Sequence, residues 1–206
     1  AESWCNGRVV VYTDGASRNN QHRAVRRAGV GAFWAKDHPL NISEPLDGAA
    51  QTNNRAELTA VIRALGSDLR PLEIRTDSQY VFKGVTCWLA GWRAAGWRSR
   101  GREISLDEIL AQRPAAYDHI LKVKAHASWK DIADGNTTTE HKLGNDAADA
   151  LAVAGAVARA VDPDQLHDFQ WRLATAQAVQ AMMLDILEAR RNHPKRSPTS
   201  AVIDVS

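Results

Sequence analysis

Residues 8–15 read RVVVYTDG, a run of β-branched and aromatic residues that ends at an Asp-Gly pair. Such a run favours a buried β-strand and Asp-Gly favours a turn, so we expect a strand over its first six residues with Asp14 at its end. Residues 72–78 read LEIRTDS and show the same arrangement, with Asp77 after a short strand. Ligands usually bind beside the carboxyl ends of strands in α/β sheets. These two acids are therefore the first candidates for a functional site.

The surrounding segments predict a mixed α/β domain. Asn53–Leu65 has apolar residues at helical spacing, Ser78 is a candidate N-cap of a helix that runs to about Leu89, and Lys142–Val161 is an Ala-rich helix. The other expected elements are strands over Ala28–Trp34, Asn41–Leu46 and Ile120–Val123, a short helix over Leu106–Gln112, a short helix with a protruding loop over Gly91–Arg102, and a loop over Ser128–His141. The order β-β-β-α-β-α-α-β-α implies a mixed sheet with helices packed on it.

The C-terminal part has a different pattern. Pro163 interrupts the sequence, and Asp164–Arg191 carries apolar residues at a spacing that indicates one long amphipathic helix. The last residues are rich in proline and serine, which is typical of disorder. We therefore predict a domain over 1–161, a helical extension over 162–193 and a disordered tail over 194–206. Whether the helix packs on the domain, self-associates or binds a partner protein stays open.

The composition is that of a globular protein, with 44% apolar and 24% charged residues in a chain of 206. No apolar stretch is long enough to cross a membrane, and the first residues do not resemble a signal peptide. Cys5 and Cys87 are too few for a disulfide framework or a zinc site, so we expect an intracellular, reducing compartment such as the cytoplasm or nucleus. The chain has no initiator Met, which is compatible with a piece of a longer protein.

The net charge of +2 averages over an uneven distribution of arginines. Arg93, Arg98, Arg100 and Arg102 lie in one short stretch, and Arg23, Arg26 and Arg27 in another. Such basic patches are compatible with a polyanionic partner, although a merely solvated surface accounts for them equally well.

Two further acids complete a candidate metal site. Glu57 lies in the first turns of the expected helix, and Asp149 lies on the last helix of the domain, on the same face as Asp146. If neighbouring strands present Asp14 and Asp77 side by side, their repulsion requires a cation. Oxygen ligands without cysteine or several histidines favour magnesium or manganese over zinc. Two such ions would activate a water and stabilise a leaving oxygen in phosphodiester hydrolysis.

Each acid also has a simpler interpretation. Asp14 is a turn former, Asp77 is a helix cap, and Glu57 and Asp149 are solvated helix residues in these alternatives. Spacing alone does not decide between them and a metal site.

Five segments occur in the order VVVYTDGAS, TNNRAELTAV, IRTDSQYV, VKAHAS and GNDAADALA. Together they resemble the type 1 ribonuclease H family over about Arg8–Ala158. The resemblance implies a five-stranded mixed sheet flanked by helices. It implies an endonuclease that hydrolyses the RNA strand of RNA–DNA hybrids and leaves 5′-phosphate and 3′-hydroxyl ends. It also implies two Mg²⁺ ions as cofactors, with Mn²⁺ as a substitute, and it places the metal-binding acids at Asp14, Glu57, Asp77 and Asp149, the last in preference to Asp146.

The resemblance also implies roles for other residues. His126 matches the family's mobile histidine, which helps product release or proton transfer. The positions that contact 2′-hydroxyls match Asn20, Asn53, Asn54 and Gln79, and Thr52 lies with Asn54 near the pocket for a DNA phosphate. The basic, aromatic region that contacts the DNA strand matches Trp88, Trp92, Trp97, Arg93 and Arg98. Turn and cap roles for Asn20 and Asn53, and core packing for the tryptophans, are the alternatives.

The sequence departs from the family in three places. Ala49-Ala50-Gln51 stands where relatives often have an arginine, so the DNA-strand contact is weaker or comes from another arginine such as Arg55. The segment between His126 and Asp149 is longer than in compact bacterial members, and the C-terminal extension is additional. Two other functions stay open: a ribonuclease H domain cut from a retroelement reverse transcriptase polyprotein, and a non-catalytic hybrid-binding module. The presence of all four acids argues against the second.

Overall fold

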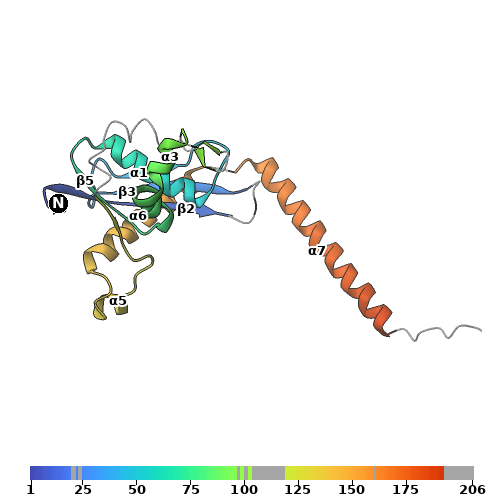
Figure 1. The fold of residues 1–206 in the computed structure, drawn as a ribbon. Coiled ribbons are helices and arrows are strands. Elements are labelled where there is room, and N and C mark those ends of the chain that lie inside the picture. The colour runs from blue at the N-terminus through green and yellow to red at the C-terminus, as the bar shows by residue number, and fades with distance from the viewer. Residues whose placement is uncertain are drawn as a thin grey trace, which may run out of the picture. The chain divides into compact units, whose positions relative to one another are not determined.

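The computed structural model describes residues 1–19, 22, 25–96, 98–99, 102–103, 119–159 and 161–192, with backbone alone for Arg93, 98–99 and 102–103 (Figure 1). The chain divides into two compact units, Ala1–Ala160 and Val161–Ser206, and each is described by itself.

The first unit is built on a mixed sheet with the strand order β4-β3-β2-β5-β8. The strands are β2 (Arg8–Arg18), β3 (Arg27–Phe33), β4 (Ile42–Pro45), β5 (Leu72–Thr76) and β8 (Ile120–Lys122). The pairs β2–β3 and β3–β4 are antiparallel, whereas β2–β5 and β5–β8 are parallel. This confirms the predicted five-stranded mixed sheet. A short strand, β1 (Trp4–Cys5), extends it by a hairpin with β2.

Strand β2 continues through Asp14 and Gly15, so the prediction that it ends there in a turn is wrong. Its parallel pairing with β5 stops at Thr13, opposite Thr76, but its antiparallel pairing with β3 goes on to Arg18. Gly15 is needed for close packing, because a Cβ at this position would overlap the backbone of Glu57. Asp14 therefore lies inside a strand at the point where one of its two neighbours ends.

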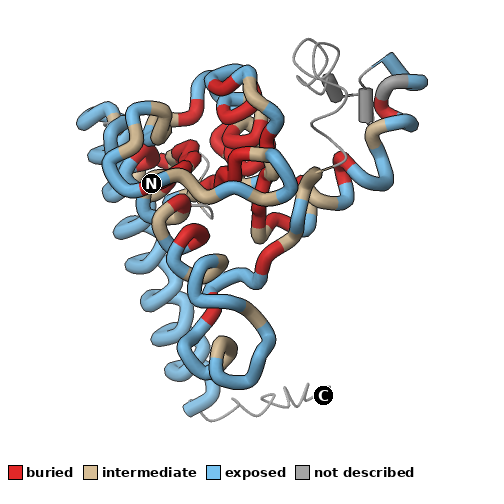
Figure 2. The backbone as a smooth tube through the Cα atoms, turned by 90° about the vertical axis from the view of Figure 1, so that its left-hand side faces the viewer, coloured by how far each residue is buried: buried red, intermediate tan, exposed pale blue. Residues whose placement is uncertain are grey.

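The two faces of β2 contact different helices because successive side chains point to opposite sides of a strand. Val9 and Val11 share a buried cluster with Val61 of α1 (Asn53–Ser67). Val10 and Tyr12 pack with Ala148 of α6 (Thr139–Ala158). Figure 2 shows the buried segments concentrated in this unit. Even-numbered residues of β2, including Asp14, consequently face α6.

The helix that Ser78 was predicted to cap begins there, since the Ser78 hydroxyl accepts a hydrogen bond from Val81 N. It runs past the predicted end at Leu89, as α2 (Gln79–Lys83), a π-helical segment η1 (Gly84–Trp88) and α3 (Leu89–Ala94). A two-stranded ribbon follows, formed by β6 (Arg98–Ser99) and β7 (Arg102–Glu103). The helix expected over Leu106–Gln112 lies outside the described residues.

The segment predicted as a loop over Ser128–His141 contains helix α5 (Trp129–Ala133) and the start of α6, so that prediction is wrong. Ser128 and Asp131 form a capping box, in which each side chain accepts a hydrogen bond from the backbone of the other residue. Thr138 caps α6 by accepting from His141 N. These local capping bonds begin two helices in a sequence without apolar periodicity.

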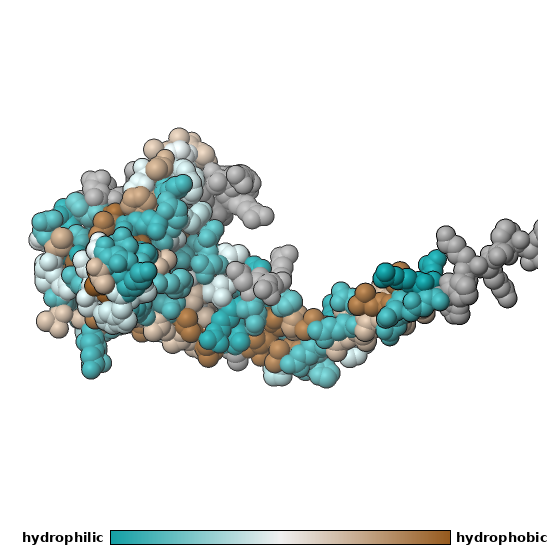
Figure 3. Space-filling view, turned by 90° about the horizontal axis from the view of Figure 1, so that it is seen from below, coloured by the Kyte–Doolittle hydropathy of each residue, from teal (hydrophilic) through white to brown (hydrophobic). Residues whose placement is uncertain are grey.

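The second unit contains the predicted long helix, α7 (Pro163–Asn192). Its apolar side chains are not confined to one face: Met182, Met183 and Leu184 are consecutive and exposed, and successive helical residues point about 100° apart. The expected amphipathic pattern is therefore wrong, and Figure 3 shows apolar and hydrophilic residues alternating along α7. The tail predicted as disordered lies outside the described residues. Within the described chain, no helix has the length and apolarity needed to span a membrane.

Candidate metal centre

Three of the predicted acids lie together at the carboxyl end of β5. Asp14, Glu57 and Asp77 each offer a carboxylate oxygen, and these atoms lie within 4.8 Å of one another. Because Thr13 pairs with Thr76, Asp14 inside β2 and Asp77 just after β5 lie at the same level on neighbouring strands. Glu57 reaches the same place from the first turns of α1. The sheet register and one helix therefore bring together acids that are far apart in the sequence.

Asp149 of α6 lies next to this group. It is not one of the three acids whose oxygens lie within 4.8 Å, but its charge and its hydrogen bonding to Asp14 help to raise the Asp14 pKa. Asp146, one turn earlier, forms an ion pair of 2.6 Å with Lys142. The structure thus brings Asp149 toward the acidic group and ties Asp146 to a lysine, which favours Asp149 as the fourth acid.

Burial and mutual repulsion perturb two of the acids strongly. Burial, followed by the charges of Asp14 and Asp77, raises the pKa of Glu57 to about 9. Burial and then the charge of Asp77 raise the pKa of Asp14 to about 7, although a 2.8 Å hydrogen bond from Gly15 N acts in the opposite direction. In the absence of a counter-charge these carboxyl groups therefore do not all ionise at neutral pH.

The donor set fits a hard divalent cation. All the ligand atoms are carboxylate oxygens, which such cations prefer. Among the described residues, Glu57 Oε2 is buried and has no hydrogen-bond partner, while its Oε1 accepts from Asn53 Nδ2 over 3.2 Å. A buried carboxylate oxygen without a partner is costly, and a cation would remove that cost.

Asn145 is a site residue that the sequence analysis missed. It lies on α6, only 3% exposed, and its Nδ2 donates a 2.9 Å hydrogen bond to Asp77 Oδ2. It stands four residues before Asp149 and so lies on the same face of the helix. Asn145 belongs to the GNDAADALA segment and stands one helical turn before Asp149, which is a signal that the two share a face. The sequence does not show, however, that its side chain contacts Asp77.

Arg75 was also not predicted from the sequence. Its side chain links the sheet to the start of α6 by hydrogen bonds. Its side chain is buried, and Nη1 donates to the Tyr12 hydroxyl at 2.8 Å and to Glu140 Oε1 at 2.9 Å. Its Nε donates to Glu73 Oε1 at 2.8 Å. The Tyr12 hydroxyl in turn donates to the backbone oxygen of Glu140 at 3.2 Å. This network joins β2 and β5 to the helix that carries Asn145 and Asp149.

Comparison with known proteins identifies the family of this chain. The sequence profile of the family described as RNase H matches residues 6–157. The chain belongs to the RNase H family. This confirms the resemblance, and the group formed by Asp14, Glu57 and Asp77 is the acidic metal-binding group typical of an RNase H.

Individual relatives agree with this membership. A Ribonuclease H of Schizosaccharomyces pombe is 39% identical over 155 residues, which cover 74% of this chain and 54% of the relative. Ribonuclease H1 of Homo sapiens is 35% identical, with 72% and 50% covered. The chain thus spans about half the length of these two relatives. A Ribonuclease H of Albidiferax ferrireducens is 36% identical, with 71% and 93% covered.

Solved structures agree on the fold. The PFV RNase H domain matches with a TM-score of 0.50 and 26% identity, covering 72% of this chain and 94% of that domain. LC9-RNase H1, described as a type 1 RNase H with the type 2 active-site motif, matches with a TM-score of 0.50 at 23% identity, covering 85% and 86%.

The residues predicted to bind an RNase H substrate have varied surroundings. Thr52 is the N-cap of α1 and accepts from Arg55 N, while Asn54 and Gln79 are exposed at the starts of α1 and α2. Trp88 is 40% exposed, whereas Trp92 is 8% exposed within the core. Asn20 and Trp97 lie outside the described residues, and only the backbone is described for Arg93 and Arg98.

The loop before α1 is organised by Gln51 and Arg55. Gln51 Nε2 donates to the backbone oxygens of Leu46 and Gly48, and its Oε1 accepts from Ala28 N. Arg55 Nη1 donates to the backbone oxygens of Asp47 and Ala50. The suggestion that Arg55 replaces the missing arginine stays a prediction, and its guanidinium already binds this loop.

His126 lies in the turn between β8 and α5, where it is exposed. Its φ of 45° is in the left-handed region, which is uncommon for residues other than glycine. After His126, the capping box of Ser128 and an ion pair between Lys124 and Asp131 fix the start of α5. His126 is thus exposed to solvent in a short turn, and the contacts of Lys124 and Ser128 with Asp131 fix the residues on either side of it.

Proposed function

We propose that this chain is an endonuclease that hydrolyses the RNA strand of RNA–DNA hybrids and leaves 5′-phosphate and 3′-hydroxyl ends. The observation that carries the proposal is the group formed by Asp14, Glu57 and Asp77, within 4.8 Å, in a member of the RNase H family. The relatives named Ribonuclease H support the substrate class.

The proposed cofactor is a pair of Mg²⁺ ions, for which Mn²⁺ can substitute. Asp14, Glu57, Asp77 and Asp149 would hold them, and they would supply an activated water and a counter-charge for the leaving oxygen. The surrounding residues keep the ligands in place: Asn145 orients Asp77, and Asn53 orients Glu57. Such outer contacts are expected to matter for metal affinity.

His126 is proposed to assist product release or proton transfer beside this centre. Its exposure in a turn supports a role in which the side chain exchanges protons with solvent.

The proposed contacts to RNA 2′-hydroxyls come from Asn20, Asn53, Asn54 and Gln79, with Thr52 near a DNA phosphate. Asn54 and Gln79 support this proposal because they are exposed close to Glu57 and Asp77 in the sequence. Contacts to the DNA strand are proposed for Trp88, Trp92, Trp97, Arg93 and Arg98. The burial of Trp92 favours a supporting role, since its ring lies 5.8 Å from that of the more exposed Trp88.

The test is a cleavage assay of the full chain with labelled RNA–DNA hybrid, double-stranded RNA and double-stranded DNA, in Mg²⁺ and with EDTA as a control. We expect cleavage of the hybrid alone, in the RNA strand, and none with EDTA. Hybrid binding without any product would instead support a non-catalytic binding module. Equal cleavage of double-stranded DNA would contradict the proposed specificity.

A further inference from the structure

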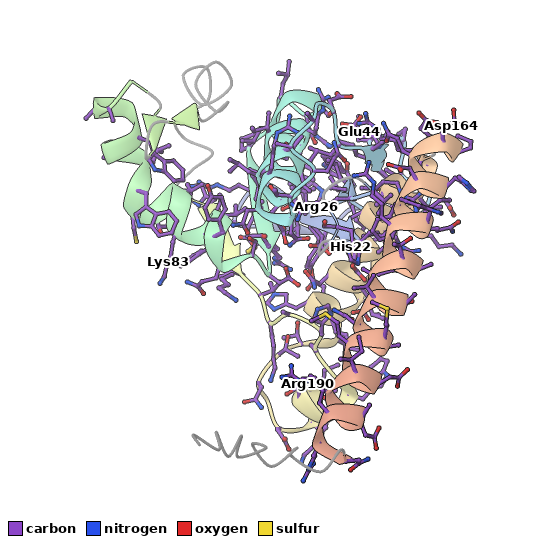
Figure 4. All side chains as sticks on the ribbon, turned by 90° about the vertical axis from the view of Figure 1, so that its right-hand side faces the viewer. His22, Arg26, Glu44, Lys83, Asp164 and Arg190 are labelled. Carbon is purple, nitrogen blue, oxygen red and sulfur yellow. The ribbon has the colours of Figure 1, made fainter. Side chains whose placement is uncertain are left out.

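The hairpin formed by β2 and β3 concentrates positive charge. From Gly15 to Lys36 the sequence has no acidic residue, and its basic residues, histidine aside, are Arg18, Arg23, Arg26, Arg27 and Lys36. The connection between the two strands includes His22 and Arg26, which are labelled in Figure 4. Three of these arginines form one of the basic patches of the sequence, and the proposed substrate contacts use none of the four.

Arg18 and Arg27 lie directly opposite each other at the end of the β2–β3 ladder. They are cross-strand partners, so both side chains leave the same face of the sheet. Among the described residues neither of them forms an ion pair, whereas Arg63, Arg70 and Arg75 each pair with two carboxylates. Like charges directly opposite each other destabilise a sheet, and an anion bound beside them would offset that repulsion.

Arg27 has a role in the fold, whereas Arg18 is left over. Arg27 Nη1 donates a 3.1 Å hydrogen bond to the backbone oxygen of Arg159 at the C-terminal end of α6, where a positive charge is favourable. Arg18 is exposed, and its side chain has no hydrogen-bond partner in the part of the chain that the structure describes. The charge of Arg18 is therefore available to a ligand.

The hairpin also extends away from the metal centre. β2 is parallel to β5, and it continues beyond Asp14 to Arg18 after the pairing with β5 has stopped at Thr13. Asp14 and Arg18 are four residues apart on the same face of one strand, which is about 13 Å at roughly 3.3 Å per residue. One strand of a duplex carries a phosphate about every 3.4 Å along its axis, so this distance corresponds to about four nucleotides. A hybrid that lies along β2 with its scissile phosphate at the metal centre therefore has phosphates within reach of Arg18.

We propose that Arg18, with Arg27 beside it, binds a backbone phosphate of the RNA–DNA hybrid about four nucleotides from the cleavage site. The inference rests on the proposed function, because it takes the hybrid as the occupant of the metal centre. The chemistry favours a phosphate: guanidinium groups bind phosphate oxygens by two parallel hydrogen bonds, and the phosphate charge would lie between two arginines that repel each other. Arg27 keeps its bond to α6, so Arg18 supplies the main contact.

The test is hybrid binding over a series of salt concentrations in Mg²⁺, with Asp77→Asn as the background because it is expected to bind without cleaving. Adding Arg18→Gln should make the slope of log K against log salt less steep by about 0.9, the share of one phosphate contact. Arg18→Lys retains the charge and should keep the slope of the background. The matched control is Arg63→Gln, an exposed arginine paired with Glu44 and Asp47, which should also keep it. An unchanged slope in Arg18→Gln, or an equal change in Arg63→Gln, would overturn the proposal.

Two further measurements separate a phosphate contact from a structural role. Without nucleic acid, Arg18→Glu should raise Tm, since it replaces repulsion by an attraction to Arg27, and it should weaken hybrid binding more than Arg18→Gln does. With the wild-type metal centre, the loss in Arg18→Gln should appear in KM for the hybrid rather than in kcat. A fall in Tm for Arg18→Glu would contradict the proposal. Failure of the wild-type chain to cleave any hybrid would count against the proposed function alone, because the salt dependence of binding decides on Arg18 without cleavage.

Discussion

Asn145 of α6 donates a hydrogen bond of 2.9 Å from Nδ2 to Oδ2 of Asp77, which follows β5. This contact joins the helix that carries Asp149 to the strand end that carries Asp77. Asn145 is almost fully buried, and a hydrogen bond from a group in such low-dielectric surroundings is stronger than one in water. One amide side chain therefore links Asp77 of the acidic group directly to the helix that carries Asp149.

Replacing Asn145 by Ala should lower kcat about 10- to 100-fold, as is usual for residues that orient metal ligands. The Mg²⁺ concentration for half-maximal activity should rise, while KM for the hybrid changes little. Asn145→Asp should be worse than Asn145→Ala, because it adds a fifth carboxylate to the group. Asp146→Asn, one residue further on and paired with Lys142 at the surface, is the control and should stay within about twofold of wild type. An unchanged Mg²⁺ dependence in Asn145→Ala would contradict this role.

Asp77→Asn should abolish cleavage and leave hybrid binding largely intact, because it removes a ligand without changing the shape of the surface. In metal-free buffer the same substitution should raise Tm, since it removes the Asp77 charge whose repulsion helps to raise the pKa of Asp14 and of Glu57. Cleavage, hybrid binding and thermal unfolding in EDTA would each be measured on the same preparation. Cleavage at the wild-type rate would show that the metal assignment is wrong.

The parts of the site that follow from strand periodicity were predictable. Asp14 and Asp77 follow similar buried runs, and the parallel pairing of those strands puts the two acids side by side. The length of β2 was not predictable in the same way, because it depends on pairing with β3 beyond Asp14. Local sequence alone favours a turn at Asp-Gly, and the tertiary contact overrides it.

Asn145 and Arg75 were missed for a different reason. Their roles depend on which face of α6 packs against which strand, and a local sequence pattern does not predict that packing. Helix α5, by contrast, was missed although its signal is local. The spacing of Ser128 and Asp131 is that of a capping box, and it was passed over because no apolar periodicity follows.

The stability of the metal-free protein should fall as the pH rises from about 5 to about 9. The pKa of Asp14 is raised to about 7 and that of Glu57 to about 9, both above their ordinary values of 3.8 and 4.5. Over this range the folded chain binds more protons at these groups than the unfolded chain, so stability decreases with increasing pH. Thermal unfolding in EDTA would show it, and Glu57→Gln should flatten the dependence. A pH dependence that is the same in wild type and Glu57→Gln would contradict the assignment.

Trp88 and Trp92 should behave differently on truncation. Trp92 is buried, and its ring lies so close to Gly84 that a Cβ there would come within 2.9 Å, so Trp92→Ala should destabilise the fold by about 3–5 kcal/mol. Trp88 is 40% exposed, and Trp88→Ala should cost less stability but weaken hybrid binding. Urea unfolding and hybrid affinity on both variants separate the two roles. Equal losses of stability would contradict the distinction.

Arg75→Leu should destabilise the protein by about 3–5 kcal/mol, because it leaves Glu73 without its cation and removes the link to Glu140. The control is Arg63→Leu, whose ion pairs with Glu44 and Asp47 are exposed and should contribute at most about 1 kcal/mol. Since the Arg75 network holds the start of α6, the variant should also need more Mg²⁺ for half-maximal activity at a temperature where it is fully folded. Arg75→Lys, which retains the charge but not the three-way hydrogen bonding, should fall between wild type and Arg75→Leu. If Arg75→Leu lost stability with no change in Mg²⁺ dependence, the network would support the fold without positioning the acids.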